Sequence, residues 1–283
     1  MHLFHTIGGK TKLAATPSES IPWHHFEKLQ LNEQQAELIK NDALAVWTAL
    51  PLTEKLLREQ NYDGEFASFL SAWFEKEKKH AELLLEYLQR FWPVLLPSDK
   101  ELNTISADCA LVPSLESIML HFCREIRLMQ WFKTSARWQS EAVIKKIYRV
   151  IAADEARHAA TYLAYMKQAV SHYGDEARIA FSKGAALMLN RMKMSQVFPP
   201  AGLHFQAGFY PSGIIQQGQS AEDMRLVGEN MLLSLGFDWE QKAMNAILNN
   251  TSHLLGEDFT DEQALNQYRK TRIAASYNQA GFY

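Results

Sequence analysis

Two short segments of the sequence carry the same pair of metal-binding side chains at the same spacing. Glu77 and His80 form one Glu-x-x-His pair, and Glu155 and His158 form the other. Residues three apart lie on one face of an α-helix, so both side chains of each pair can point inward together. A single pair often occurs by chance, as a solvated charge pair. Two pairs on separate long helices favour a shared metal site.

Lone carboxylates must complete such a site, because di-metal four-helix bundles take Glu-x-x-His from two helices and one Glu from each of the others. Glu125 fits this requirement. It lies as many residues before Ser140, the expected cap of the next helix, as Glu155 lies after it. The two carboxylates are therefore expected at one height on antiparallel neighbours, ~22 Å from the turn.

The first helix offers two candidates for the remaining carboxylate. A turn ending at Gly64 precedes the helix that carries Glu77, and Glu54 lies somewhat nearer to this turn than Glu77 does, whereas Asp42 lies farther away. Spacing alone leaves both residues open. We choose Glu54 and keep Asp42 as the alternative.

The donor set indicates which metal would bind. Carboxylate oxygens with two imidazoles and no thiolate suit iron or manganese better than copper or structural zinc, and we expect two iron ions. Asp154 and Arg157 adjoin the second pair and could hold a ligating imidazole through its other ring nitrogen. A surface ion pair is the alternative interpretation. Trp73 shares a helix face with Glu77 and could belong to the core or to an electron route.

Periodic apolar positions, broken by Gly and Pro, place these residues on helices. The predicted helices cover about 32–60, 65–91, 113–138, 140–173 and 175–195, with two or three more over 220–275. We expect an irregular N-terminal arm over 1–30, a bundle over 31–195, and a loop with C-terminal helices over 196–283, packed on the same domain. The predicted fold class is therefore all-α.

Composition excludes several classes of function. The formal net charge is only -3, so no electrostatic footprint for nucleic acid is present. No apolar run reaches the ~18 residues needed for a membrane span, and the first residues lack the pattern of an export signal. Cys109 and Cys123 lack the spacing of a zinc or iron–sulfur site, and two thiols fit a reducing compartment. We expect a cytoplasmic protein.

Four segments around the candidate ligands match motifs of one enzyme family. They are the segment from Trp73 to Leu88, with its Glu-x-x-His and closing Tyr-Leu; Ile151-Ala152-Ala153-Asp154-Glu155-Ala156-Arg157-His158; Glu125 with the later Thr134 and Ala136-Arg137; and Leu52-Thr53-Glu54. On these segments the chain resembles the soluble acyl-acyl carrier protein desaturases, the stearoyl-type enzymes of plastids and their bacterial relatives. The last segment favours Glu54 over Asp42.

The resemblance implies a ferritin-like four-helix bundle with additional C-terminal helices and a two-iron centre. Its catalytic, metal-ligating residues would be Glu54, Glu77, His80, Glu125, Glu155 and His158. The implied reaction is oxygen-dependent introduction of a double bond into an acyl chain carried on acyl carrier protein, with a homodimer as the expected assembly. The chain has no dinucleotide fingerprint and no cysteine cluster, so electrons would come from a separate donor such as ferredoxin.

The chain also departs from the family. Leu128 stands one turn beyond Glu125, where plant desaturases carry a threonine, and the resemblance fades after about residue 200. One alternative is therefore a related two-iron oxygenase that hydroxylates or N-oxygenates a thioester-bound or free metabolite. A second alternative is an iron-handling ferritin-like protein, against which the long C-terminal region argues.

Overall fold

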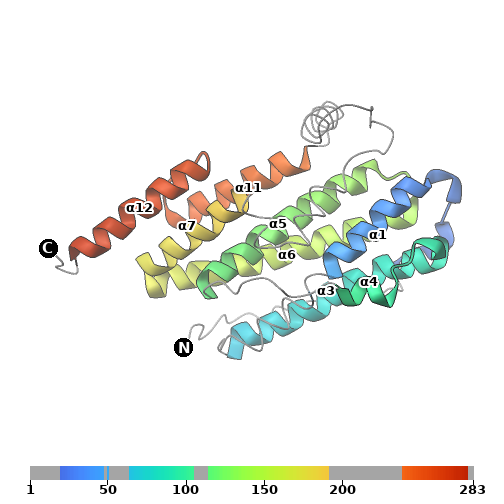
Figure 1. The fold of residues 1–283 in the computed structure, drawn as a ribbon, viewed down its shortest axis with the longest axis horizontal. Helices are drawn as coiled ribbons and strands as arrows, with labels where there is room; N and C mark the ends of the chain where they lie inside the picture. The colour runs from blue at the N-terminus through green and yellow to red at the C-terminus, as the bar shows by residue number, and fades with distance from the viewer. Residues whose placement is uncertain (1–19, 48–49, 51–63, 105–113, 191–237, 280–283) are drawn as a thin grey trace.

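The structure is a computed structural model that describes residues 20–47, 50, 64–104, 114–190 and 238–279 (Figure 1). Within these ranges the chain forms eight α-helices and no strand, so the predicted all-α class is confirmed. The helices are α1 (Glu33–Trp47), α3 (Gly64–Phe91), α4 (Asp99–Thr104), α5 (Ser114–Trp138), α6 (Ala142–Tyr173), α7 (Asp175–Leu189), α11 (Trp239–Leu255) and α12 (Glu262–Gln279). Three short 3-10 helices lie at Trp23–His25, Lys28–Gln30 and Pro93–Leu95.

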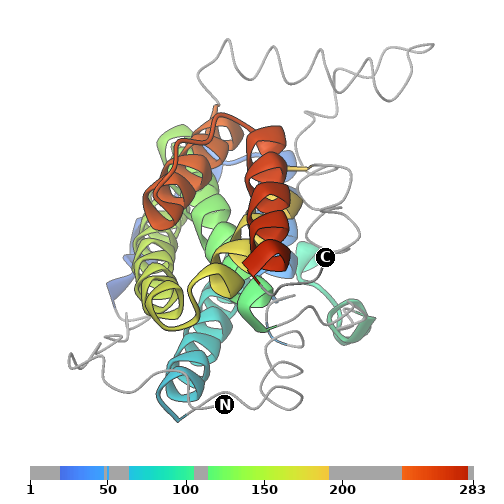
Figure 2. The same cartoon turned by 90° about the vertical axis from the view of Figure 1, so that its left-hand side faces the viewer.

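The two long helices α5 and α6 lie side by side at the centre of the molecule (Figure 1). Helix α3 packs against α6 and against α1, while α7 and α11 pack on α5. Viewed along the helices, α11 and α12 lie at one side of the molecule and α3 at the opposite side (Figure 2). The C-terminal helices therefore pack on the same body as the bundle.

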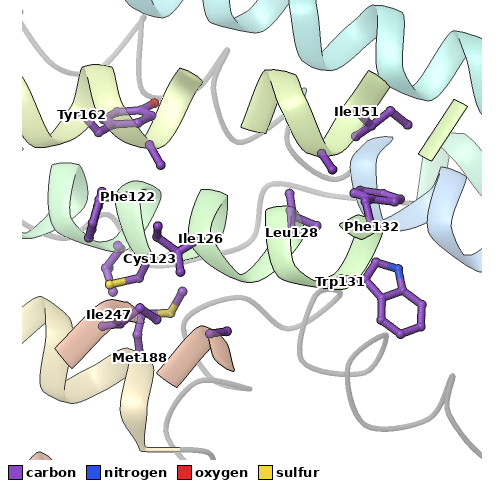
Figure 3. Packing of buried hydrophobic residues seen from close by; sticks show 14 of the residues in the cluster. Phe122, Cys123, Ile126, Leu128, Trp131, Phe132, Ile151, Tyr162, Met188 and Ile247 are labelled. Carbon is purple, nitrogen blue, oxygen red and sulfur yellow. The ribbon is translucent and has the colours of Figure 1, made fainter. Parts of the chain in front are cut away.

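Helix α5 is buried on opposite sides by different helices. Cys123 and Ile126 point towards Met188 of α7 and Ile247 of α11, whereas Tyr162 of α6 lies across from them (Figure 3). All five side chains are buried, and α5 is buried at every position from 115 to 128. Helix α5 therefore lies inside the helical assembly, although its buried residues include charged side chains such as Arg124, Glu125 and Arg127.

Helix α6 does not begin with the expected cap. The carboxylate of Glu141 accepts the backbone N–H groups of Val143 at 3.0 Å and Ile144 at 2.9 Å. Ser140 instead donates its hydroxyl to the backbone carbonyl of Gln30 at 2.8 Å. The prediction of a Ser140 cap was wrong by one residue, because the buried Glu141 carboxylate satisfies the free N–H groups of the first turn.

The helix ends agree closely with the periodic pattern where the structure describes them. Helix α6 ends at Gly174, whose φ of 55° lies in the left-handed region that glycine tolerates. Helix α7 ends at Leu189, earlier than predicted, and only α11 and α12 of the region 220–275 lie within the described residues. No helix in the described ranges is long and apolar enough to cross a membrane.

Candidate metal centre

Three helices bring four buried ligand groups together. Glu77 of α3, Glu125 of α5, and Glu155 and His158 of α6 each offer one ligand atom, and these atoms all lie within 4.8 Å of one another. Each of the four residues has a relative exposure of 0%. Residues far apart in the sequence thus form one group that could hold a metal ion.

His80 lies beside this group and turns its Nδ1 atom towards it. Its Nδ1 lies 3.3 Å from Oε1 of Glu155 and 3.5 Å from Oε1 of Glu77. His158 turns the same nitrogen inward, with Nδ1 at 3.0 Å from Glu125 and 3.2 Å from Glu155. All five predicted ligands that the structure describes therefore converge.

Asp154 holds the outer side of the His80 ring. Its Oδ2 lies 3.1 Å from His80 Nε2, so a proton on Nε2 leaves the Nδ1 lone pair facing the centre. Arg157 donates to the other Asp154 oxygen, and Lys76 lies 3.9 Å from Oδ2. Burial disfavours the Asp154 carboxylate, but His80 and these cations outweigh that effect and lower its pKa. Asp154 thus bonds the imidazole of His80 on α3 rather than that of the adjacent His158, and Arg157, which is half exposed, bonds Asp154.

The centre has a deficit of positive charge. Burial raises the pKa of Glu125, and the neighbouring Glu155 and Glu77 carboxylates raise it further. The imidazoles show the complementary effect. Burial lowers the pKa of His158, but its bonds to Glu125 and Glu155 and the nearby Glu77 carboxylate outweigh this and hold it well above the ordinary value. Protons thus supply charge that a bound cation could supply instead.

Several ligand atoms lack hydrogen bonds, although they are buried. Among the described residues, Oε1 of Glu77, Nδ1 of His80 and Oε1 of Glu155 have no hydrogen-bond partner. Buried polar atoms normally have partners. These three atoms face one another across the centre, so a metal ion accepted there would satisfy all of them, and the donor set fits iron or manganese.

Arg124 is a member of the site that sequence reasoning missed. Its Nη1 donates to Oε2 of Glu77 and to Oε1 of Glu125, each at 3.1 Å. An arginine directly before Glu125 is expected about 100° away around the helix. Its long side chain nevertheless reaches back into the centre, and no spacing rule signals this.

An aromatic layer covers one side of the centre. Trp73 donates its Nε1–H to Oε2 of Glu125 at 3.3 Å, and its ring lies 5.2 Å from the His121 ring. His121 stacks on Tyr162 at 5.8 Å but is not among the grouped ligands. Burial and the Arg124 charge lower the pKa of His121 to about 3, although Glu77 opposes this shift. The His121 ring is therefore neutral, and Trp73 is both part of the buried core and a direct neighbour of the candidate ligand Glu125.

The two candidates for the carboxylate of the first helix, Glu54 and Asp42, have different outcomes. Glu54 lies outside the described residues and stays a prediction. Asp42 of α1 is described and is not in the ligand group. It accepts hydrogen bonds from Trp131 Nε1 at 2.8 Å and from the Tyr148 hydroxyl at 2.5 Å. Asp42 thus joins α1 to α5 and α6, which is a different role from the one considered for it as the alternative ligand.

Comparisons with known proteins add nothing to these observations. No protein-family model matches the chain, and no curated protein or solved structure shows significant similarity to it. The fold and the site define an all-α protein with a buried carboxylate–histidine group that could hold a metal ion.

Proposed function

We propose that this protein is a two-iron, oxygen-dependent desaturase that introduces a double bond into an acyl chain carried on acyl carrier protein. The convergence of Glu77, His80, Glu125, Glu155 and His158 in one buried group is the observation that supports this proposal most strongly. The same five residues carry the family motifs in the sequence. Glu54 would supply the sixth ligand, within a ferritin-like bundle.

The protein's own residues would fix the orientation of the ligands. Asp154 keeps the proton of His80 on Nε2, and Trp73 holds one oxygen of Glu125. When bound, iron supplies the oxygen chemistry that can remove hydrogen from an unactivated C–H bond. Phe122 and Leu128, each about one turn from Glu125 on α5, are buried at 1% and 3% exposure and would help to keep water away.

We propose a separate protein such as ferredoxin as the electron donor, an acyl carrier protein thioester as the substrate, and a cytoplasmic homodimer as the assembly. These parts rest on the resemblance of the motifs. The absence of a nucleotide fingerprint and of clustered cysteines in the sequence is consistent with an external donor.

Hydroxylation or N-oxygenation by the same centre is the second candidate. Leu128 supports it, because an apolar side chain stands where plant desaturases carry a hydroxyl group, one turn beyond Glu125, and this side chain is buried in the core (Figure 3). Desaturation removes two hydrogens from the substrate, whereas oxygenation adds an oxygen atom. The two outcomes therefore differ in product mass.

The test is mass spectrometry of products from iron-loaded, ferredoxin-reduced protein supplied with oxygen and a panel of acyl carrier protein thioesters. Loss of two hydrogens is expected, and gain of oxygen would select the second candidate. Glu125→Gln should lose both iron and product. Glu116→Gln is the matched control, because Glu116 is also a buried glutamate of α5 but bonds Lys183 at 2.8 Å outside the centre. Iron-loaded protein that leaves the whole panel unchanged would refute the proposed substrate class.

A further inference from the structure

Arg124 places a permanent positive charge inside the candidate metal centre. Its side chain is buried, with a relative exposure of 5%. A guanidinium does not lose its proton in proteins. Its bonds to Glu77 and Glu125 therefore share one fixed cation between α3 and α5.

These bonds divide the centre into two halves. In the imidazole half, Oε1 of Glu77 and Oε1 of Glu155 face the Nδ1 atoms of His80 and His158 and have no hydrogen bond. In the guanidinium half, Oε2 of Glu77 and Oε1 of Glu125 are both occupied by Arg124. An ion can bind the two oxygens of the imidazole half and Nδ1 of His80 without breaking a hydrogen bond, and it displaces only the bonds of His158 Nδ1 to Glu125 and Glu155 if it also takes that nitrogen. The guanidinium half is already filled by a cation.

A charge count points the same way. Metal ligands must be deprotonated, so Glu77, Glu125 and Glu155 together with the proposed Glu54 bring four negative charges to a loaded centre, which two divalent ions alone would balance. The guanidinium of Arg124 would add a fifth positive charge once both ions are bound. A second divalent ion would compete with the guanidinium for the same oxygens.

We infer that Arg124 makes the two metal equivalents unequal. The first ion binds in the imidazole half with Arg124 in place, and the second binds only by displacing the guanidinium from Glu77 and Glu125. Two charge-assisted hydrogen bonds are lost in that step, so the two dissociation constants differ by on the order of 100-fold. This inference rests on the proposed metal centre and assigns Arg124 a positioning role in its loading.

The test is a titration of metal-free protein with Co²⁺, followed by calorimetry and by the visible absorption of the bound ion. Wild-type protein should take up one tight equivalent and a second that is on the order of 100-fold weaker. Arg124→Gln removes the competing charge, so the second equivalent should tighten at least ~10-fold. Arg124→Lys keeps a charge in the centre and should keep the two equivalents unequal.

Arg127→Gln is the matched control. Arg127 is a second buried arginine of α5, but it lies 3.6 Å from Glu240 and against the Trp239 ring of α11. Its replacement should leave the two-step titration as in the wild type. Two equal equivalents in the wild type, or an unchanged ratio in Arg124→Gln, would overturn the inference.

A second measurement follows Arg124 in the wild-type protein itself. In a titration of wild-type protein with diamagnetic Zn²⁺, the guanidinium N–H signals of Arg124 should keep the slow hydrogen exchange of bonded groups with the first equivalent and lose it with the second. Arg124→Lys provides their assignment by loss of the signals. Loss of this protection with the first equivalent would overturn the inference about Arg124. Absence of any bound metal would refute the metal centre itself, and the two failures are therefore distinguishable.

Discussion

Asp42 connects three helices, and its replacement should be among the most destabilising changes in the protein. Its carboxylate is 1% exposed and accepts the Trp131 Nε1–H of α5 and the Tyr148 hydroxyl of α6. Asp42→Ala leaves both donors buried without this acceptor. A buried donor left unsatisfied costs about 1–3 kcal/mol, so the two together should lower the free energy of unfolding by about 2–6 kcal/mol.

Asp42→Asn should cost roughly half as much, because the amide keeps one acceptor oxygen for one of the two donors. The measurement is urea unfolding followed by circular dichroism. A double-mutant cycle of Asp42→Ala with Tyr148→Phe isolates one of the bonds, and a coupling energy of about 1–3 kcal/mol is expected. Burial and the Asp42 carboxylate raise the pKa of Tyr148, so its hydroxyl stays a donor throughout the neutral range.

Metal content provides the decisive control on this reasoning. If Asp42 is structural, folded Asp42→Asn protein binds as much metal as the wild type. A loss of metal with unchanged stability would show instead that Asp42 is a ligand. A cost below about 1 kcal/mol for Asp42→Ala, or a coupling energy near zero, would refute the assignment of these hydrogen bonds.

Three further predictions concern other parts of the bundle. Asp154→Ala should weaken Co²⁺ binding about 10–100-fold in a titration, because the ring of His80 loses its outer hydrogen bond; unchanged affinity in folded protein would contradict this role. The folded-state pKa of His121, about 3, lies below its unfolded value, so below pH ~6.5 only the unfolded chain gains this proton and the wild type loses stability as the pH falls. His121→Phe removes that loss. The free energy of unfolding of this variant relative to the wild type, measured by chemical unfolding, should therefore rise by about 2 kcal/mol from pH 7 to pH 5. A difference that does not depend on pH would show that His121 titrates normally. Gly184→Ala would place a Cβ 2.9 Å from the Cβ of Met119. The resulting overpacking, about 1–3 kcal/mol, should exceed the ~1 kcal/mol gained in helix propensity, so the melting temperature should fall. A higher melting temperature would show that α5 and α7 separate easily.

The part of the site that sequence could predict is the part set by helical periodicity. Glu77 and His80 share one face of α3, and Glu155 and His158 share one face of α6, because residues three apart must do so. The equal spacing of Glu125 and Glu155 from the turn between their helices then predicted that they would meet, and the structure brings them together.

Features that depend on side-chain reach or on distant partners could not be read in this way. The bonds of Asp42 join residues separated by 89 and 106 positions, and no local period encodes such a pairing. Arg124 enters the centre through the length of its side chain rather than through its helical position. At the start of α6, Ser140 has the usual chemistry of a cap, but Glu141 is the residue that lies buried against the first turn.

The complete burial of the candidate ligand group would set how fast a metal ion could enter it. Because Glu77, Glu125, Glu155 and His158 are all 0% exposed, an ion would reach them only when packed helices part. At high ion concentration the rate of uptake should therefore level off at the rate of that opening. The same barrier slows escape, so metal once bound should be retained against a chelator for longer than its equilibrium affinity alone would indicate.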